Sequence, residues 1–132
     1  MWNFSGFVKR KNNLMSDLDL WLGGIVEDTP IPFDIKNIIF FYDQNGKVFS
    51  LGMGGVENTP KTATGFEFFP KEAEFCFEKQ LLSIQNEEYF RSLAKSMIDE
   101  CFFDKNLKTQ FAGKKIYFGK LNEDVEYLFT IV

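Results

Sequence analysis

The stretch IKNIIFFYDQNGKVFSLGMGG, residues 35–55, carries the clearest structural signal in the sequence. Two runs of aromatic and β-branched residues flank Asn45-Gly46, a favoured hairpin turn because both residues tolerate a positive φ. The first run is apolar on both faces, at Ile38, Ile39, Phe40 and Phe41. We therefore predict a β-hairpin whose first strand is central in a sheet that is covered on both sides.

Further strands are predicted on either side of this hairpin. Residues 3–10, 66–69 and 71–79 have strand character, and residues 114–132 form a second hairpin that turns at Asn122-Glu123-Asp124. In LDLWLGGIVED, residues 18–28, Leu18, Leu20 and Leu22 alternate with Asp17, Asp19 and Trp21, which favours a strand. A short helix capped by Ser16 and ended by Gly23 is the alternative for that segment.

One long helix is predicted from about residue 87 to residue 103. Asn86 is a good N-cap, and Glu87 and Glu88 are favourable in the first turn. The apolar stripe consists of Phe90, Leu93, Ala94, Met97, Ile98 and Cys101. We therefore expect a single α+β domain over residues 1–132, with about seven strands in a curved, mainly antiparallel sheet and this helix packed on it.

The chain contains no histidine and two cysteines, Cys76 and Cys101. Without histidine, Ser-His-Asp and Cys-His catalytic systems and His-containing zinc sites are excluded. Carboxylates flank Cys76 and oppose thiolate formation, while Cys101 belongs to the apolar stripe. We predict no catalytic residue, no metal site and no cofactor, and thus a protein that is not an enzyme.

Charge is unevenly distributed along the sequence. The net charge is −4, but residues 12–103 hold 15 acidic and 7 basic side chains, a net charge of −8.

In the N-terminal stretch MWNFSGFVKRK the apolar residues precede the charges, the reverse of a secretory signal, and no run is long enough to span a membrane. We expect a cytoplasmic location, no membrane partner, and a monomer.

A short motif occurs twice, as GGIVEDTP at residues 23–30 and as GGVENTP at residues 54–60. The favoured interpretation is a shared device by which a strand ends, because Gly-Gly permits close backbone approach and the residue before proline leaves the helical region. An ancient duplication and a paired ligand-binding role are the alternatives. A phosphate loop is rejected because no helix begins after the second copy.

Two further groups of residues raise the question of chemistry. Glu72 and Glu74 lie two apart on one strand face, which could suggest a glycosidase pair but is more typical of a solvated or partner-binding face. A mixture of lysines and aromatic residues could suggest a nucleic-acid platform, at Lys114, Lys115, Tyr117, Phe118 and Lys120. Adjacent Tyr117 and Phe118 point to opposite faces, however, so we predict no nucleic-acid partner.

With its acidic strand face, its lack of histidine and its single Phe-, Lys- and Asn-rich domain, the chain resembles the small cytoplasmic immunity proteins of bacterial contact-dependent and polymorphic toxin systems. That resemblance rests on overall character and implies an inhibitor that binds a cognate toxin domain, often a nuclease. The acidic charge independently favours a basic protein partner. The predicted partner-binding residues form two acidic groups, Glu72, Glu74 and Glu78, and Glu123, Asp124 and Glu126.

Two other functions are compatible with the sequence. A curved sheet lined by Phe and Tyr could enclose an apolar pocket for a small molecule or a reaction. Exposed strand edges, such as residues 125–132, could instead pair with other copies of the chain in an assembly.

Overall fold

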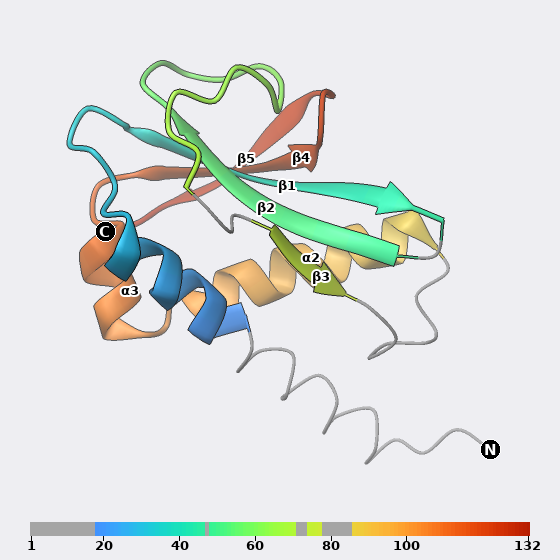
Figure 1. Ribbon diagram of the computed structural model, residues 1–132, viewed down its shortest axis with the longest axis horizontal. Helices are drawn as coiled ribbons and strands as arrows, with labels where there is room; N and C mark the ends of the chain where they lie inside the picture. Colours follow the sequence, from blue (N-terminus) through green and yellow to red (C-terminus); the bar gives the residue numbers. More distant parts are fainter. Residues whose placement is uncertain (1–17, 47, 71–73, 78–85) are drawn as a thin grey trace, which may run out of the picture.

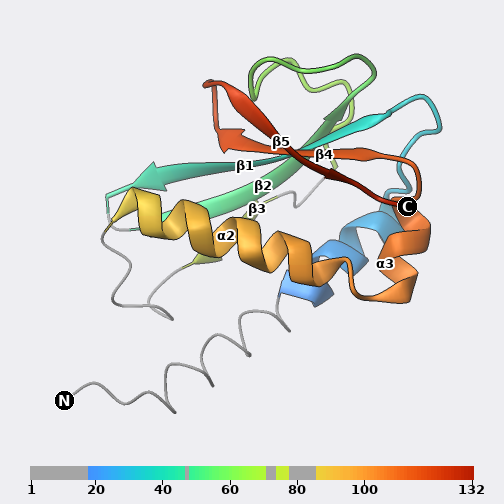
Figure 2. The same cartoon turned by 180° about the vertical axis from the view of Figure 1, so that it is seen from behind.

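The computed structural model describes residues 18–46, 48–70, 74–77 and 86–132 (Figures 1 and 2). It is an α+β fold in which helices cover one face of a five-stranded mixed sheet with the spatial order β3-β2-β1-β4-β5. The strands are β1 (Asn37–Asn45), β2 (Val48–Val56), β3 (Glu74–Phe77), β4 (Lys115–Lys120) and β5 (Val125–Thr130).

The predicted central hairpin is confirmed. β1 and β2 pair antiparallel from Asn37 opposite Val56 to Asn45 opposite Val48, and Gly46 in the turn has a φ of 64°. β1 is the middle strand of the sheet. Its side chains alternate between two cores, so the continuous apolar run reflects burial on both faces.

The predicted architecture of about seven strands with one long helix (about 87–103) is wrong for the described part of the chain. Five strands and three helices are present there, and β1 pairs parallel with β4, from Asn37 opposite Lys115 to Tyr42 opposite Lys120. Of the predicted strand at residues 66–69, only Phe68 forms an isolated bridge, to Gly55. The predicted strand at 3–10 lies outside the described residues.

The largest local error concerns residues 18–28, which form a helix and not a strand. Leu18, Leu22, Ile25 and Val26 are buried, with the i, i+4, i+7, i+8 spacing of one helical face. Leu20, which the alternating pattern placed beside Leu18 and Leu22, is 75% exposed. The alternative of a short helix that ends at Gly23 is also wrong, because the helix continues beyond it.

The remaining helices are α2 (Glu87–Cys101) and α3 (Lys105–Gln110). Asn86 caps α2 as predicted, since its side chain accepts a hydrogen bond of 3.1 Å from the backbone N–H of Tyr89, and the predicted apolar stripe is buried. α2 ends at Cys101, before the predicted residue 103, and the next residue, Phe102, is buried with its ring edge-on to Phe40 and Phe111. Within the described residues, no helix is long and apolar enough to cross a membrane.

The face of the sheet away from α2 is covered by the segment at residues 57–70, which passes from the end of β2 over β1 and β4 (Figure 1). The Phe66 ring stacks on Phe41 with centroids 4.9 Å apart. It lies directly over Gly54, where a Cβ atom would come within 2.5 Å of the ring. The second copy of the repeated motif thus permits a close approach of two segments.

The repeated motif is not a shared strand exit. Its second copy begins in the last three residues of β2 and continues past the end of that strand. Its first copy lies in the helix at 18–28 and the turn after it, where the N–H of Thr29 donates to the carbonyl of Ile25 at 2.8 Å. Similar sequence therefore ends two different kinds of element.

Candidate functional site

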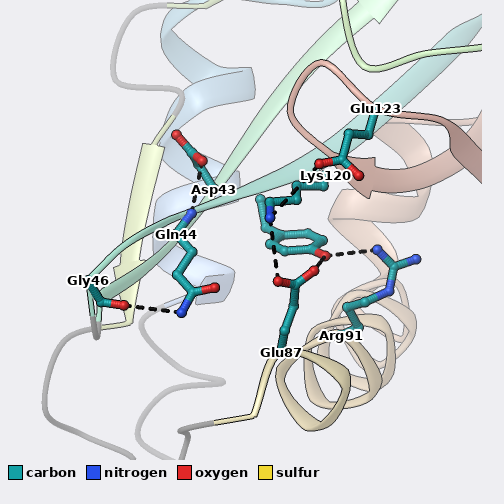
Figure 3. Close-up of polar contacts among 8 residues, drawn as sticks. Asp43, Gln44, Gly46, Glu87, Arg91, Lys120 and Glu123 are labelled. Carbon is teal, nitrogen blue, oxygen red and sulfur yellow. Dashed lines mark hydrogen bonds and ion pairs between the residues drawn. The ribbon is translucent and has the colours of Figure 1, made fainter.

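Four polar side chains converge where the helix layer meets the sheet (Figure 3). We call Tyr42, Glu87, Arg91 and Lys120 the Tyr42 cluster. The Tyr42 hydroxyl donates to Glu87 Oε2 at 2.8 Å and accepts from Arg91 Nη1 at 2.9 Å. Lys120 Nζ lies 3.4 Å from Glu87 Oε1 and 3.9 Å from a carboxylate oxygen of Glu123. The cluster links β1, β4 and α2 through alternating charges.

The fold brings these residues together in two ways. The parallel register places Tyr42 directly opposite Lys120, and the helical repeat places Glu87 and Arg91 one turn apart on the same side of α2. The Tyr42 ring stacks on Phe118 with centroids 5.5 Å apart and planes 17° from parallel. The Arg91 guanidinium carbon lies 5.4 Å from each of these ring centroids. Aromatic stacking therefore orients both the hydroxyl and the guanidinium.

The electrostatic environment fixes the charge states of the cluster. Burial raises the pKa of Tyr42, so its hydroxyl stays protonated and can donate. The hydrogen bond from that hydroxyl lowers the pKa of Glu87, and the nearby positive charge of Lys120 lowers it further. The charge of Glu87 in turn raises the pKa of Lys120. Glu87 and Lys120 are therefore both charged near neutral pH.

Glu87→Gln is expected to change how stability depends on pH. Because the pKa of Glu87 is lowered on folding, its ionised form stabilises the protein above the ordinary carboxyl pKa, and this contribution disappears as the pH falls through the lowered value. The Glu87 side chain is 42% exposed and solvent screens its interactions, so the loss at neutral pH should stay below about 1 kcal/mol. Urea unfolding at a series of pH values tests this. A difference between the wild type and the variant that persists well below the pKa of Glu87 would contradict the assignment.

A depression of about 420 Å³ opens beside the cluster and is lined by Arg91, Lys120, Glu123 and Asp124. Glu123 and Asp124 belong to the predicted partner-binding group. The structure places them beside two cations, Arg91 and Lys120, which were not predicted to take part in that group. The third member, Glu126, forms an ion pair of 2.8 Å with Lys95. The surface around the β4–β5 turn therefore carries both signs of charge.

The other predicted acidic group is not joined to this site. Glu72 and Glu78 lie outside the described residues. Glu74 begins β3, where its backbone pairs with Gly52, but the structure does not describe its side chain. That prediction stays open.

Other residues considered for chemistry lie elsewhere. Cys101 is buried in the core, as its place in the apolar stripe predicted, and burial, with the nearby Asp19, raises the pKa of its thiol. Lys114 is also buried, and its Nζ donates to the carbonyl of Ile35. Tyr117 and Phe118 lie in opposite cores, as predicted. In the described segments, no three Cys, Asp or Glu side chains are grouped as metal ligands.

Comparison of the chain with protein-family models, with curated proteins and with solved structures finds no match. Proposals about function therefore depend on the geometry and charge of the residues themselves. Within that geometry, Tyr42 and Arg91 were not predicted as site residues, and Lys120 was considered only for a nucleic-acid platform. The helical spacing of Glu87 and Arg91 was visible, but the parallel pairing that adds Tyr42 and Lys120 had no local signal.

Proposed function

We propose that this protein is a non-catalytic binding protein, an immunity-type inhibitor that neutralises a cognate bacterial toxin domain in the cytoplasm, acting as a monomer. Its contact surface would be the acidic turn between β4 and β5, with Glu123 and Asp124 at its centre. The observation that carries this proposal is the attachment of that turn, by backbone hydrogen bonds, to the segment at residues 57–70.

Three backbone hydrogen bonds hold the turn. The N–H of Ala63 donates to the carbonyl of Glu123 at 2.9 Å, and the N–H of Asn122 donates to the carbonyl of Ala63 at 3.0 Å. On the far side of the turn, the N–H of Val125 donates to the carbonyl of Lys61 at 3.0 Å. Because a pre-ordered surface loses little conformational entropy on binding, a turn held in this way suits tight association.

The carboxylates of the turn remain available for a partner. Asp124 is exposed and its side chain has no hydrogen bond or ion pair to another described residue. Glu123 is exposed and lies at the long distance of 3.9 Å from its only described cation, Lys120. Two exposed carboxylates on a fixed backbone can attract and bind the lysines and arginines of a basic partner. A nuclease cleft that normally holds phosphates offers such groups.

A small-molecule or catalytic role is less well supported. The space beside the cluster is lined by four charged residues, whereas small-molecule pockets are mostly apolar. An assembly role through β5 is also less well supported, since a register shift opposite Ile116 and Tyr117 interrupts the regular ladder of that edge strand.

The experiment that tests the proposal is a growth assay. The candidate toxin to test first is whatever protein is encoded immediately upstream of this chain. Its C-terminal domain is expressed alone, where it should arrest growth, and then together with this chain. Co-expression of the wild type should restore growth, and the Glu123→Lys/Asp124→Lys variant should protect less. With purified proteins, the variant should associate about tenfold more slowly at low salt, and this difference should shrink as salt rises.

The matched control is Lys105→Glu/Lys108→Glu, which changes as many charges on exposed positions of α3. It should protect as well as the wild type. If the wild type gives no protection, the proposed function is refuted. If the Glu123→Lys/Asp124→Lys variant protects as well as the wild type, the proposed surface is refuted.

A further inference from the structure

We infer that Arg91 binds a carboxylate of the partner, so that the depression beside the Tyr42 cluster contacts the partner through both signs of charge. This inference rests on the proposed function and adds to it the chemistry of the group that the partner must supply. It differs from a simple attraction between an acidic surface and a basic one.

Arg91 has unused hydrogen-bonding capacity. A guanidinium carries five N–H donors, and the one hydrogen bond of Arg91 to a described residue runs from Nη1 to the Tyr42 hydroxyl. No ion pair joins Arg91 to a carboxylate in the ranges that the structure describes. The side chain is only partly exposed and lines the depression. Donors in such a position favour an anionic ligand, since a charged acceptor makes the strongest hydrogen bonds.

The neighbouring cations are already paired. Lys120 contacts Glu87 and Glu123, and Lys95 contacts Glu126. Arg91 is instead held between a hydroxyl and the faces of the Tyr42 and Phe118 rings. Stacking orients the planar guanidinium before any partner arrives, and a fixed guanidinium matches a carboxylate with two parallel hydrogen bonds.

The two signs of charge define the partner. Asp124 and Glu123 on the turn select basic groups, while Arg91 on α2 selects an acidic one, and all three line the same depression. A protein site that holds carboxylates among lysines and arginines fits both. Enzymes that cleave phosphate esters with metal ions carry that combination, because carboxylates hold the metal and basic groups hold the phosphate.

The test compares Arg91→Met, Arg91→Lys and the control Lys108→Met, at an exposed position of α3, in full-length chains bound to the candidate domain encoded upstream. Arg91→Met keeps an unbranched apolar side chain over the rings but removes the guanidinium, and should raise the dissociation constant about tenfold, mainly through faster dissociation. Arg91→Lys should recover only part of the affinity, because an ammonium cannot make the paired hydrogen bonds. Lys108→Met should bind within about twofold of the wild type. Thermal unfolding of each variant confirms that the fold is intact.

A second measurement needs no partner. In NMR spectra of the full chain, the Nε–H signal of Arg91 should shift on titration with acetate, and should shift much less with chloride at equal ionic strength. Wild-type affinity for Arg91→Met together with weak binding by the Glu123/Asp124 variant would overturn this inference and leave the proposed function standing. Failure of the wild type to bind the upstream domain would refute both.

Discussion

Replacement of Phe90 by alanine is expected to lower the free energy of unfolding by about 3–5 kcal/mol, the range typical of a large aromatic residue deleted from a core. Phe90 on α2 is 0% exposed. Its ring stacks on Phe49 of β2 with centroids 4.2 Å apart and planes 10° from parallel, and it lies 5.5 Å from the Tyr42 ring. Alanine would leave a cavity between the helix and the sheet, and it would remove support from the tyrosine that holds Arg91.

Urea unfolding followed by circular dichroism measures this loss. Tyr89→Ala is the matched control, because its ring is the adjacent aromatic on the same helix but is 42% exposed. It should cost less than about 1 kcal/mol. A Phe90→Ala variant as stable as Tyr89→Ala would show that α2 does not pack on the sheet through this ring.

Replacement of Gly119 by alanine is expected to destabilise the protein by about 2–3 kcal/mol and to displace the acidic turn. A Cβ atom at this position in β4 would lie 2.6 Å from the backbone oxygen of Asp124 and 3.0 Å from the Cα of Val125. Both atoms belong to the backbone of the paired strand and turn, so the clash cannot be relieved by rotation of a side chain. The strands must separate, and Asp124 must move with them.

Gly24→Ala is the control for this prediction. Gly24 lies in the helix at 18–28, and nothing lies within 4 Å of the position that its Cβ would take. Alanine there should raise stability by about 0.5–1 kcal/mol, because alanine favours a helix over glycine. Urea unfolding gives both values, and amide chemical shifts of residues 119–125 report movement of the turn. Equal stability of Gly119→Ala and the wild type would contradict the close approach of β5.

The elements that the sequence predicted correctly are those with a local signal. Asn45-Gly46 between two β-rich runs specified the hairpin, and Asn86 before the apolar stripe specified the start of α2. At residues 18–28 two periodicities competed. The spacing of Leu18 and Leu22 fits both a strand and a helix, and only Ile25 and Val26 favour the helix. Two glycines between Leu22 and Ile25 weaken the helical pattern.

Only part of the candidate site was predicted, because only some of its residues have a local signal in the sequence. Glu123 and Asp124 were identifiable because they lie in a predicted turn. Tyr42 and Lys120 are far apart in the sequence, and they meet only through the parallel pairing of β1 with β4. Parallel strands are joined by a long crossover, and nothing in the sequence of β1 or β4 predicts which strand each will pair with. The environment of Arg91 therefore required the three-dimensional structure.

The central position of β1 also bears on how the chain folds during translation. Its antiparallel partner β2 follows at once, so this hairpin can form within microseconds. Its parallel partner β4 is made only after α2 and α3. Until the ribosome releases residues 115–120, one side of an apolar strand has no neighbour. High contact order slows the final step, and the nascent chain is most prone to aggregation during that interval.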